Sequence, residues 1–201
     1  LTHCPLKAPT PKATSAPILS NPTPSREQLL DVDPRVPYIY RPGELVWFNK
    51  GTAWGLAVIC KRQLINSAPN YQLQPLSHPL HHCPVVAKSQ EDLRPWLAWT
   101  LPRTTHPQIA NLKYDEVPWE RVLNGEFGPG DTEVDGSILA GKEINDSYTP
   151  LIPLGTKTAN PNDRLYAGMF HGAEKIWVGE PVRLQVPNNN NESVVMVIQA
   201  I

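Results

Sequence analysis

The clearest pattern in the sequence is a pair of apolar runs near residue 50, separated by a short polar loop. Residues 41–48 and 54–59 are rich in β-branched and aromatic side chains, and Gly51 lies in the loop between them. Runs of this composition joined by a glycine-containing loop predict a β-hairpin. Because an isolated hairpin is barely stable in water, we expect a larger sheet or barrel around it.

A second pair of runs near the C-terminus repeats this pattern. Residues 175–186 precede a polar tip, Asn188 to Asn191, and residues 194–198 follow it. Both hairpins carry Gly-Glu-X-Val at their start and Val-Ile at their end, so that the aligned pairs are Gly43 with Gly179, Glu44 with Glu180, Val46 with Val182, and 58–59 with 197–198. The pattern leaves open whether both hairpins belong to one barrel or the second begins another module.

The region between the hairpins predicts short helices. Residues 118–123 form one candidate, with proline at the start and Gly125 after the end. Residues 134–147 form the longest candidate, which Pro150 prevents from continuing. Gly136 and Gly141 weaken this helix by about 1 kcal/mol each relative to alanine.

A further short helix is predicted after residue 88. Ser89 and Asp92 have capping-box spacing. The apolar residues that follow, interrupted by a proline at 95, are Leu93, Trp96, Leu97 and Trp99. They would form the apolar face of this helix.

Residues 1–35 differ in composition from the rest of the chain. They hold seven prolines among Ser, Thr, Asn and Lys, and too few apolar side chains to offset the entropy of ordering them alone. We expect a linker, or an extended strap on the domain or on a partner. One helical turn is predicted near Ser25 to Leu30, with Ser25 as the cap and Gln28 three residues later.

Composition supports a mainly β fold with inserted short helices. The chain has 23 prolines and 12 glycines in 201 residues, which disfavours a helical bundle, while 40% hydrophobic residues suffice for a core. A net charge of −1 predicts weak or no DNA binding. Three cysteines without CxxC spacing indicate free thiols in a reducing compartment. No apolar stretch is long enough to span a membrane.

Several short motifs contain residues that could bind a metal ion or phosphate. The segment from His78 to Cys83 holds metal-capable side chains, but they are crowded into six residues without a second ligand pair. The acidic run from Asp131 to Gly136 resembles half a calcium loop, yet Lys142 stands where a glutamate ligand belongs. The glycine-rich run 125–130 predicts a turn rather than a phosphate site. We therefore expect no metal, no cofactor and no enzymatic activity.

Aromatic residues on and before the first hairpin form the candidate binding surface: Tyr40, Trp47, Phe48 and Trp54. Neighbours in a strand point to opposite faces, so one of Trp47 and Phe48 is expected to lie outside the core. Partly exposed aromatic side chains can cage methylated lysine by cation–π attraction. We prefer a protein–protein groove, because aromatic residues anchor interfaces.

Five stretches resemble a known family. They are residues 41–59, 71–79 (YQLQPLSHP), 93–99 (LRPWLAW), 130–138 (GDTEVDGSI) and 172–184 (GAEKIWVGEPVRL). These stretches are similar to the C-terminal region of the fungal cryptic loci regulators, transcription-silencing proteins of the SHREC heterochromatin complex. Residues 1–35 carry none of the resemblance.

The resemblance implies a small barrel of the bromo-adjacent-homology (BAH-like) or Tudor-like type. It would span residues 36–201, with a long insertion at about 60–170, and we expect the domain to be truncated at its C-terminus. The implied function is a non-catalytic scaffold in the nucleus that links a chromatin remodeller, a histone deacetylase and a zinc-finger subunit. A reader of methylated histone tails or nucleic acid is the alternative, and an unrecognised enzyme the second alternative.

Overall fold

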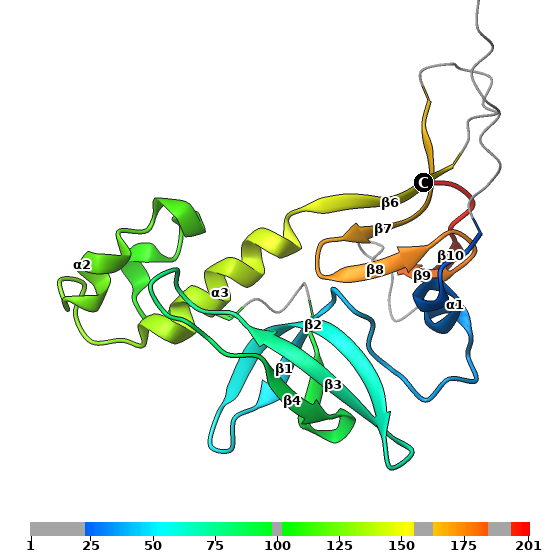
Figure 1. Cartoon of the computed structure of the whole chain (residues 1–201). Coiled ribbons are helices and arrows are strands. Elements are labelled where there is room, and N and C mark those ends of the chain that lie inside the picture. Colours follow the sequence, from blue (N-terminus) through cyan, green and yellow to red (C-terminus); the bar gives the residue numbers. More distant parts are fainter. Residues whose placement is uncertain (1–22, 98–101, 155–162, 185–193) are drawn as a thin grey trace, which may run out of the picture.

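The computed structural model describes residues 23–97, 102–154, 163–184 and 194–201 (Figure 1). Within these ranges the chain is mainly β, with antiparallel sheets and short helices, which confirms the predicted fold class. The polar tip from Asn188 to Asn191, Trp99 and most of the proline-rich segment lie outside the described residues.

The largest element is a five-stranded antiparallel sheet. Its strands are β1 (Leu45–Asn49), β2 (Trp54–Ile65), β3 (Ala68–Pro75), β4 (Val86–Ser89) and β5 (Leu93–Pro95). Their order in space is β4-β3-β2-β1-β5, so β4 and β5, which are consecutive in the chain, lie at the two opposite edges of the sheet. A single 3₁₀ turn, η1 (Gln90–Asp92), joins them. This is the strand arrangement of an SH3-like barrel, and it contains the first predicted hairpin.

The helix predicted after residue 88 is confined to the 3₁₀ turn η1, and its predicted continuation from Leu93 is wrong. Residues 93–95 are a strand that pairs with β1, with Arg94 opposite Trp47 and Leu93 opposite Phe48. The strand satisfies the outer edge of β1 and places Leu93 in the barrel core, where it is 5% exposed. Pairing with β1 has therefore ended the helical turn after Asp92 and overridden the helical pattern of the apolar residues that follow.

The barrel has two apolar faces. Its interior is filled by Tyr40, Val46, Phe48, Ala57, Ile59, Tyr71, Leu73 and Leu93. On the outer face Leu45, Leu56 and Trp96 form a buried cluster with Ala173 of the second sheet, and Ile144 of the longest helix packs against that cluster. The partly buried Trp47, Val58 and Leu76 surround it. Trp47 and Phe48 thus lie on opposite faces, as the strand period predicts.

Both predicted helices in the middle of the chain are confirmed. They are α2 (Trp119–Leu123) and α3 (Thr132–Asn145), and α3 begins two residues early because the Asp131 carboxylate caps it by accepting the Val134 N–H at 3.0 Å. With the turns η2 (Pro107–Ile109) and η3 (Tyr114–Glu116) they form a helical part beside the barrel. Its core consists of Ile109, Val117, Trp119, Val122 and Leu139.

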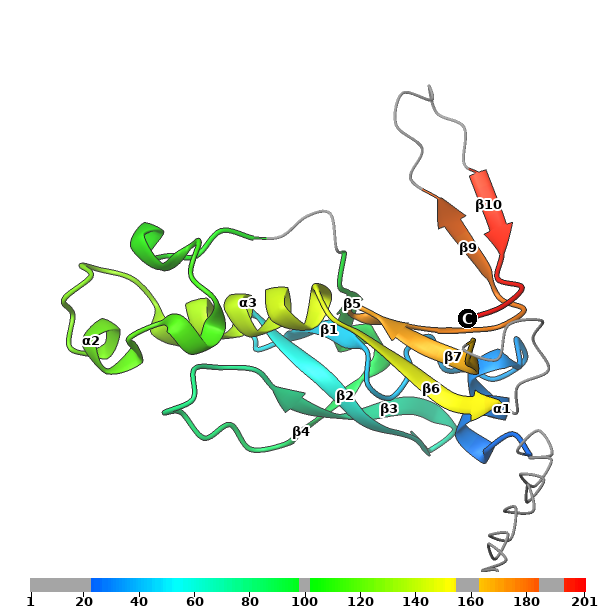
Figure 2. The same cartoon turned by 90° about the horizontal axis from the view of Figure 1, so that it is seen from above.

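After α3 the chain forms a second layer. Strands β6 (Tyr148–Leu154), β7 (Leu165–His171) and β8 (Glu174–Trp177) make a three-stranded antiparallel sheet. Strands β9 (Pro181–Leu184) and β10 (Val194–Val197) form the second predicted hairpin, in a two-stranded sheet of its own. Figure 2 shows this hairpin standing away from the rest of the molecule.

The N-terminal helix α1 (Arg26–Val32) lies beside this second layer (Figure 1). The Ser25 hydroxyl accepts the Gln28 N–H at 3.1 Å, which confirms the predicted cap. The described end of the proline-rich segment is thus a short helix in contact with the domain.

The two glycines of α3 have a packing role that the sequence did not show. A Cβ on Gly136 would lie 2.2 Å from the backbone nitrogen of His78. At this position the backbone of the helix therefore lies directly against the backbone of the segment after β3. A Cβ on Gly141 would lie 2.5 Å from the Leu56 Cδ2 atom, the end of a side chain that can rotate. The two glycines lower the intrinsic helix propensity of α3, but they allow it to pack closely against the segment after β3 and against Leu56 of the barrel.

These contacts predict a graded effect of alanine substitutions. Gly136→Ala should lower the free energy of unfolding by about 2–3 kcal/mol despite the better helix propensity of alanine, because the backbone it meets cannot move aside. Gly141→Ala should lower it by about 1 kcal/mol, because the Leu56 side chain can adjust. Urea denaturation of both variants measures the difference, and equal effects would contradict this packing account.

Candidate functional site

The four aromatic residues predicted as a binding surface lie in three different environments. Tyr40 and Phe48 are in the barrel interior, at 8% and 5% exposure. Trp47 lies on the outer face, with its ring centroid 5.6 Å from that of Trp96. Trp54 is exposed at the start of β2. The structure therefore does not bring the four side chains together on one surface.

Trp54 is the one of these four that faces solvent, and its ring is partly covered. The Arg94 guanidinium lies over it, 4.3 Å from the ring centroid. A methylated lysine on this face of the ring would have to displace an arginine already held by cation–π attraction.

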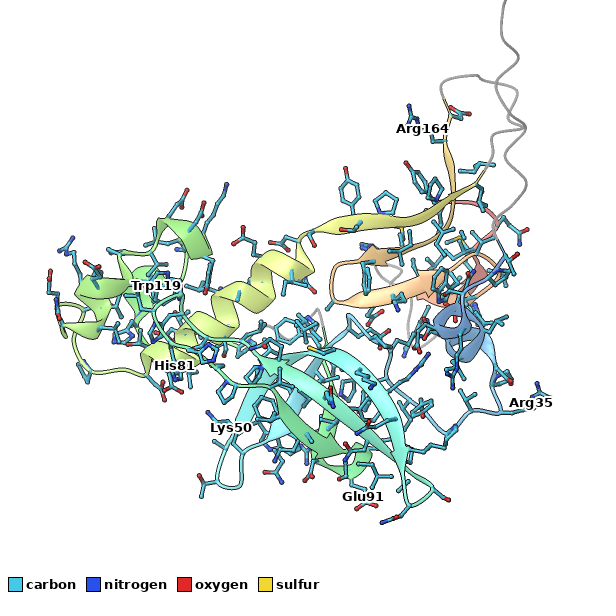
Figure 3. All side chains as sticks on the ribbon, in the orientation of Figure 1. Arg35, Lys50, His81, Glu91, Trp119 and Arg164 are labelled. Carbon is cyan, nitrogen blue, oxygen red and sulfur yellow. The ribbon has the colours of Figure 1, made fainter. Side chains whose placement is uncertain are left out.

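The segment from His78 to Cys83 lines an open depression of about 400 Å³ together with Tyr114 and Ala140. The His78 ring stacks with those of His81 and Trp119, with centroids 5.7 and 5.9 Å away. Figure 3 labels these two neighbours, His81 and Trp119. The His81 Nδ1 atom is 3.6 Å from the Cys83 Sγ atom. Within the described ranges no three His, Cys, Asp or Glu side chains are placed to hold a metal ion.

The acidic run at the start of α3 is used for local structure. Asp131 caps the helix, and the fully buried Asp135 carboxylate accepts the His106 N–H at 3.0 Å and contacts the His106 Nδ1 atom at 2.6 Å. The Asp135 carboxylate therefore fixes the loop before η2 to the helix, while the Asp131 carboxylate bonds within the helix itself.

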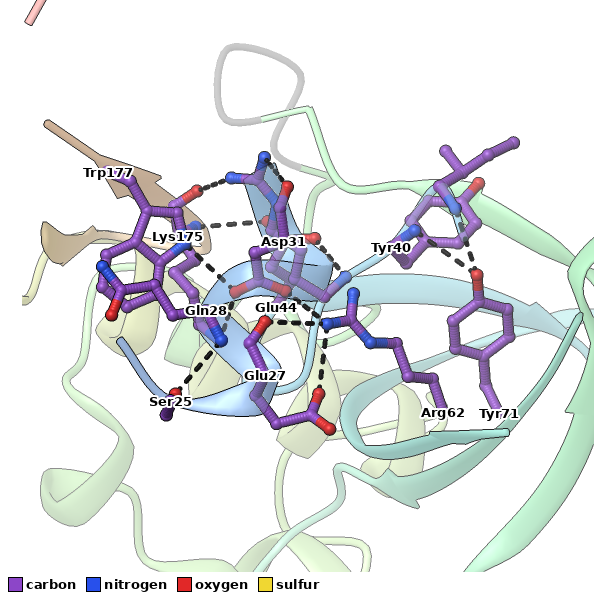
Figure 4. Close-up of polar contacts among 12 residues, drawn as sticks. Ser25, Glu27, Gln28, Asp31, Tyr40, Glu44, Arg62, Tyr71, Lys175 and Trp177 are labelled. Atoms are coloured by element: carbon purple, nitrogen blue, oxygen red, sulfur yellow. Dashed lines mark hydrogen bonds and ion pairs between the residues drawn. The ribbon is translucent and has the colours of Figure 1, made fainter. Parts of the chain in front are cut away.

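The most extensive polar arrangement is a buried charge cluster between α1, the barrel and the second layer (Figure 4). Its centre is the Asp31 carboxylate on α1, whose side chain is 0% exposed. It is 2.7 Å from the Arg62 guanidinium on β2 and 3.2 Å from the Lys175 ammonium on β8. The Trp177 indole N–H also donates to it at 3.1 Å. One side chain thus joins three parts of the fold.

The cluster extends to the base of the second hairpin. The Arg41 guanidinium forms a two-pronged ion pair with Glu180, at the turn between β8 and β9, and donates to the Asp31 carbonyl at 3.0 Å. Glu44 accepts the backbone N–H of Lys175 at 3.3 Å. Bidentate arginine–carboxylate pairs fix orientation as well as distance. The hairpin is therefore fixed to the entry of the barrel.

The cluster holds three cations and four carboxylates, one of the carboxylates at its exposed rim. The cations are Arg41, Arg62 and Lys175, and the carboxylates are Asp31, Glu44 and Glu180, with Glu27 at the exposed rim. Burial raises the pKa of the Glu44 carboxyl above its ordinary 4.5, although the backbone N–H groups of Arg41 and Lys175 that donate to it act in the opposite direction.

The two hairpins share detailed geometry at their bases. Gly43 and Gly179 have φ angles of +94° and +95°. The carboxylates of Glu44 and Glu180 each accept the N–H three residues before them, at 2.9 and 2.8 Å.

The residues at the base of each hairpin also make the same backbone hydrogen bonds. The glycine N–H donates to the isoleucine carbonyl, at 2.7 Å for Ile59 and 2.8 Å for Ile198. The isoleucine N–H returns to the glutamate carbonyl at 3.0 Å in both hairpins. The sequence alignment of the two hairpins is therefore a structural repeat.

Comparison with known proteins gives one distant likeness. No protein-family model and no curated protein matches the chain. A solved structure described as Clr2 bound to the Clr1 C-terminus superposes with a TM-score of 0.47 at 15% sequence identity, over 80% of this chain. The matched part spans 37% of that chain's length. Membership of the silencing family thus stays a prediction.

The two copies of the repeat differ in what covers them. Val46, Leu56 and Ala57 of the first hairpin are at most 1% exposed. On the second hairpin Val195, Met196 and Val197, which align with Leu56, Ala57 and the partly buried Val58, are 61%, 44% and 47% exposed. The second hairpin is therefore the part of the repeat that offers apolar surface to other molecules.

Sequence reasoning found the hairpins but missed the charge cluster. Asp31, Arg62 and Lys175 are far apart in the chain, and no motif links them. The available signal was the pair of Gly-Glu sequences, because both glutamates contact Arg41: Glu44 accepts its backbone N–H, and Glu180 pairs with its guanidinium.

The cluster predicts a large loss of stability for the substitution of one aspartate at the end of α1 and almost none for another. Asp31→Asn leaves the buried Arg62 and Lys175 without their shared counterion and should lower the free energy of unfolding by about 3–5 kcal/mol. Asp33→Asn, the matched control, removes a solvent-exposed pair with Arg35 and should change it by less than about 0.5 kcal/mol. Thermal and urea denaturation measure both, and a tolerated Asp31→Asn would exclude a stabilising role for the cluster.

The stacked His78 predicts a pH dependence of stability. Burial, together with the neighbouring His81, holds the pKa of His78 below its ordinary 6.5. Below that pH the unfolded chain takes up a proton that the folded chain resists, so stability is full above pH 6.5 and falls as the pH decreases.

This fall should be smaller in His78→Gln. Its free energy of unfolding should change less than that of the wild type between about pH 7.5 and about pH 5.5. His82→Gln, at an exposed position, is the control and should keep the wild-type profile. Identical profiles for all three proteins would show that His78 does not contribute.

Proposed function

We propose that this chain is a non-catalytic protein–protein interaction module of a nuclear gene-silencing complex of the SHREC type. Its partners would be the remodeller, the histone deacetylase and the zinc-finger subunit of that complex. The proposal joins the resemblance of residues 41–59 and 172–184 to the silencing regulators with the surface that the fold offers.

The observation that carries the proposal is the exposed apolar second hairpin. Val195, Met196 and Val197 follow one another on β10, and each is more than two-fifths exposed. Leu184 on β9 is 38% exposed. Because neighbours in a strand point to opposite faces, Val195 and Val197 expose apolar surface on one face of the hairpin, and Met196 with Leu184 on the other. Apolar surface exposed in this way on a folded domain indicates a site for another macromolecule. Its position on a hairpin that stands away from the body leaves it accessible (Figure 2).

The mounting of this hairpin supports a scaffold role. The turn before β9 is bound through Glu180 to Arg41, and through the Trp177 indole to Asp31. A surface held at a fixed orientation loses little conformational entropy when a partner binds. The charge cluster thus presents the apolar hairpin in a pre-organised position.

Co-purification with each subunit tests the proposal. We expect the wild-type chain to bind at least one of the three subunits. The double variant Val195→Glu, Val197→Glu should weaken that binding at least about tenfold by placing charges in the apolar contact. Tyr148→Glu, which replaces an exposed aromatic residue on β6, is the matched control and should bind as the wild type does.

A failure of all three subunits to bind would overturn the proposal. Equal loss in Tyr148→Glu would show that added charge, rather than the hairpin, is responsible.

A titration with histone-tail peptides separates this function from that of a methyl-lysine reader. We expect trimethylated and unmodified peptides to bind equally weakly, because Arg94 occupies the face of Trp54. Methyl-dependent binding that Trp54→Ala abolishes would favour the reader instead.

A further inference from the structure

The outer edge of β10 carries free backbone groups. Among the described residues β9 and β10 form a sheet with no third strand. The Ile198 N–H donates to the carbonyl of Glu180, the residue just before β9. Bonding to a given neighbour alternates along an antiparallel strand, so Met196 also bonds to β9. The N–H and C=O groups of Val195 and Val197 therefore point to the free edge.

The first hairpin shows what occupies this edge in the other copy of the repeat. The repeat aligns Val197 with Val58 and Val195 with Leu56. Strand β3 runs antiparallel along that edge, with Gln74 opposite Val58, and the Leu76 N–H donates to the Leu56 carbonyl at 2.8 Å. The same local geometry thus already accepts an antiparallel strand within this chain.

The other edge of the hairpin is protected. The β9 residues whose backbone groups point outward are Pro181 and Arg183, opposite Val197 and Val195. Proline has no N–H to offer, and a charged side chain discourages strand addition. No such residue stands among Val195, Met196 and Val197. The two edges therefore differ, and β10 is the one suited to pairing.

We propose that the partner binds as an added strand on β10. It would be an extended protein segment that runs antiparallel to β10, pairs with the backbone of Val195 and Val197, and covers the exposed side chains with apolar residues at alternate positions. This inference rests on the proposed function and specifies its binding mode. Main-chain pairing supplies affinity, and the alternate side chains supply selectivity.

Peptide binding with amide hydrogen exchange tests this inference. Overlapping peptides of about fifteen residues, covering the subunit that co-purifies, serve as probes. In the free protein the amides of Val195 and Val197 should exchange quickly, while the Met196 amide is protected by β9. A bound peptide should slow exchange at Val195 and Val197 and leave Met196 unchanged.

Proline substitutions provide the matched pair. Val195→Pro removes an outward N–H on β10 and should weaken peptide binding at least about tenfold. Arg183→Pro removes the outward N–H opposite it on β9 and should leave binding unchanged. Circular dichroism checks that both variants fold, and where one does not, the exchange pattern of the wild type decides.

The outcomes separate this inference from the proposed function. If a subunit or its peptide binds without slowing exchange at Val195 and Val197, strand addition is wrong while the interaction module stands. Loss of binding in Arg183→Pro alone would place the partner on β9 and also overturn the inference. If no subunit binds, the proposed function fails together with it.

Discussion

The arrangement of this molecule depends on the burial of one carboxylate. Asp31 lies on a helix of seven residues that is too short to be stable alone, yet its side chain is fully buried. A buried carboxylate is tolerated only with close cations and hydrogen-bond donors, and these come from β2 and β8 through Arg62, Lys175 and Trp177. The helix, the barrel and the second layer must therefore assemble together for all of these charges to be paired.

This constraint also sets the direction of the second hairpin. Trp177 and Glu180 flank the turn at Gly179, and both are tied to the cluster, one to Asp31 and the other to Arg41. The hairpin itself makes few contacts of its own beyond this base, as its exposed side chains show. A rigid base with an uncovered apolar strand is the combination expected of a presenting surface, because orientation is fixed before the partner arrives.

Local signals in the sequence predicted the elements well. Both hairpins, the cap at Ser25 and the helices α2 and α3 follow from residue patterns that act over a few positions. The strand at Leu93 was missed because its stabilisation comes from pairing with β1, about 45 residues away. The candidate aromatic residues show the same limit: alternation placed Trp47 and Phe48 on opposite faces, but composition alone did not show which face was covered.

The repeat separates what local sequence determines from what it does not. Gly43 and Gly179, with the glutamates that follow them, reproduce the same turn and the same first backbone bonds in two places. In the first hairpin a tight turn with positive φ at Asn66 and Ser67 returns β3 to the outer edge of β2. In the second, the described residues supply no such strand, so identical geometry leaves Val195 and Val197 with unpaired backbone groups under apolar side chains. Unpaired N–H and C=O groups at a strand edge form hydrogen bonds when another segment adds a strand there. The first copy of the repeat already has that strand, whereas the second has none within the ranges described, and this difference is the physical basis for binding at β10.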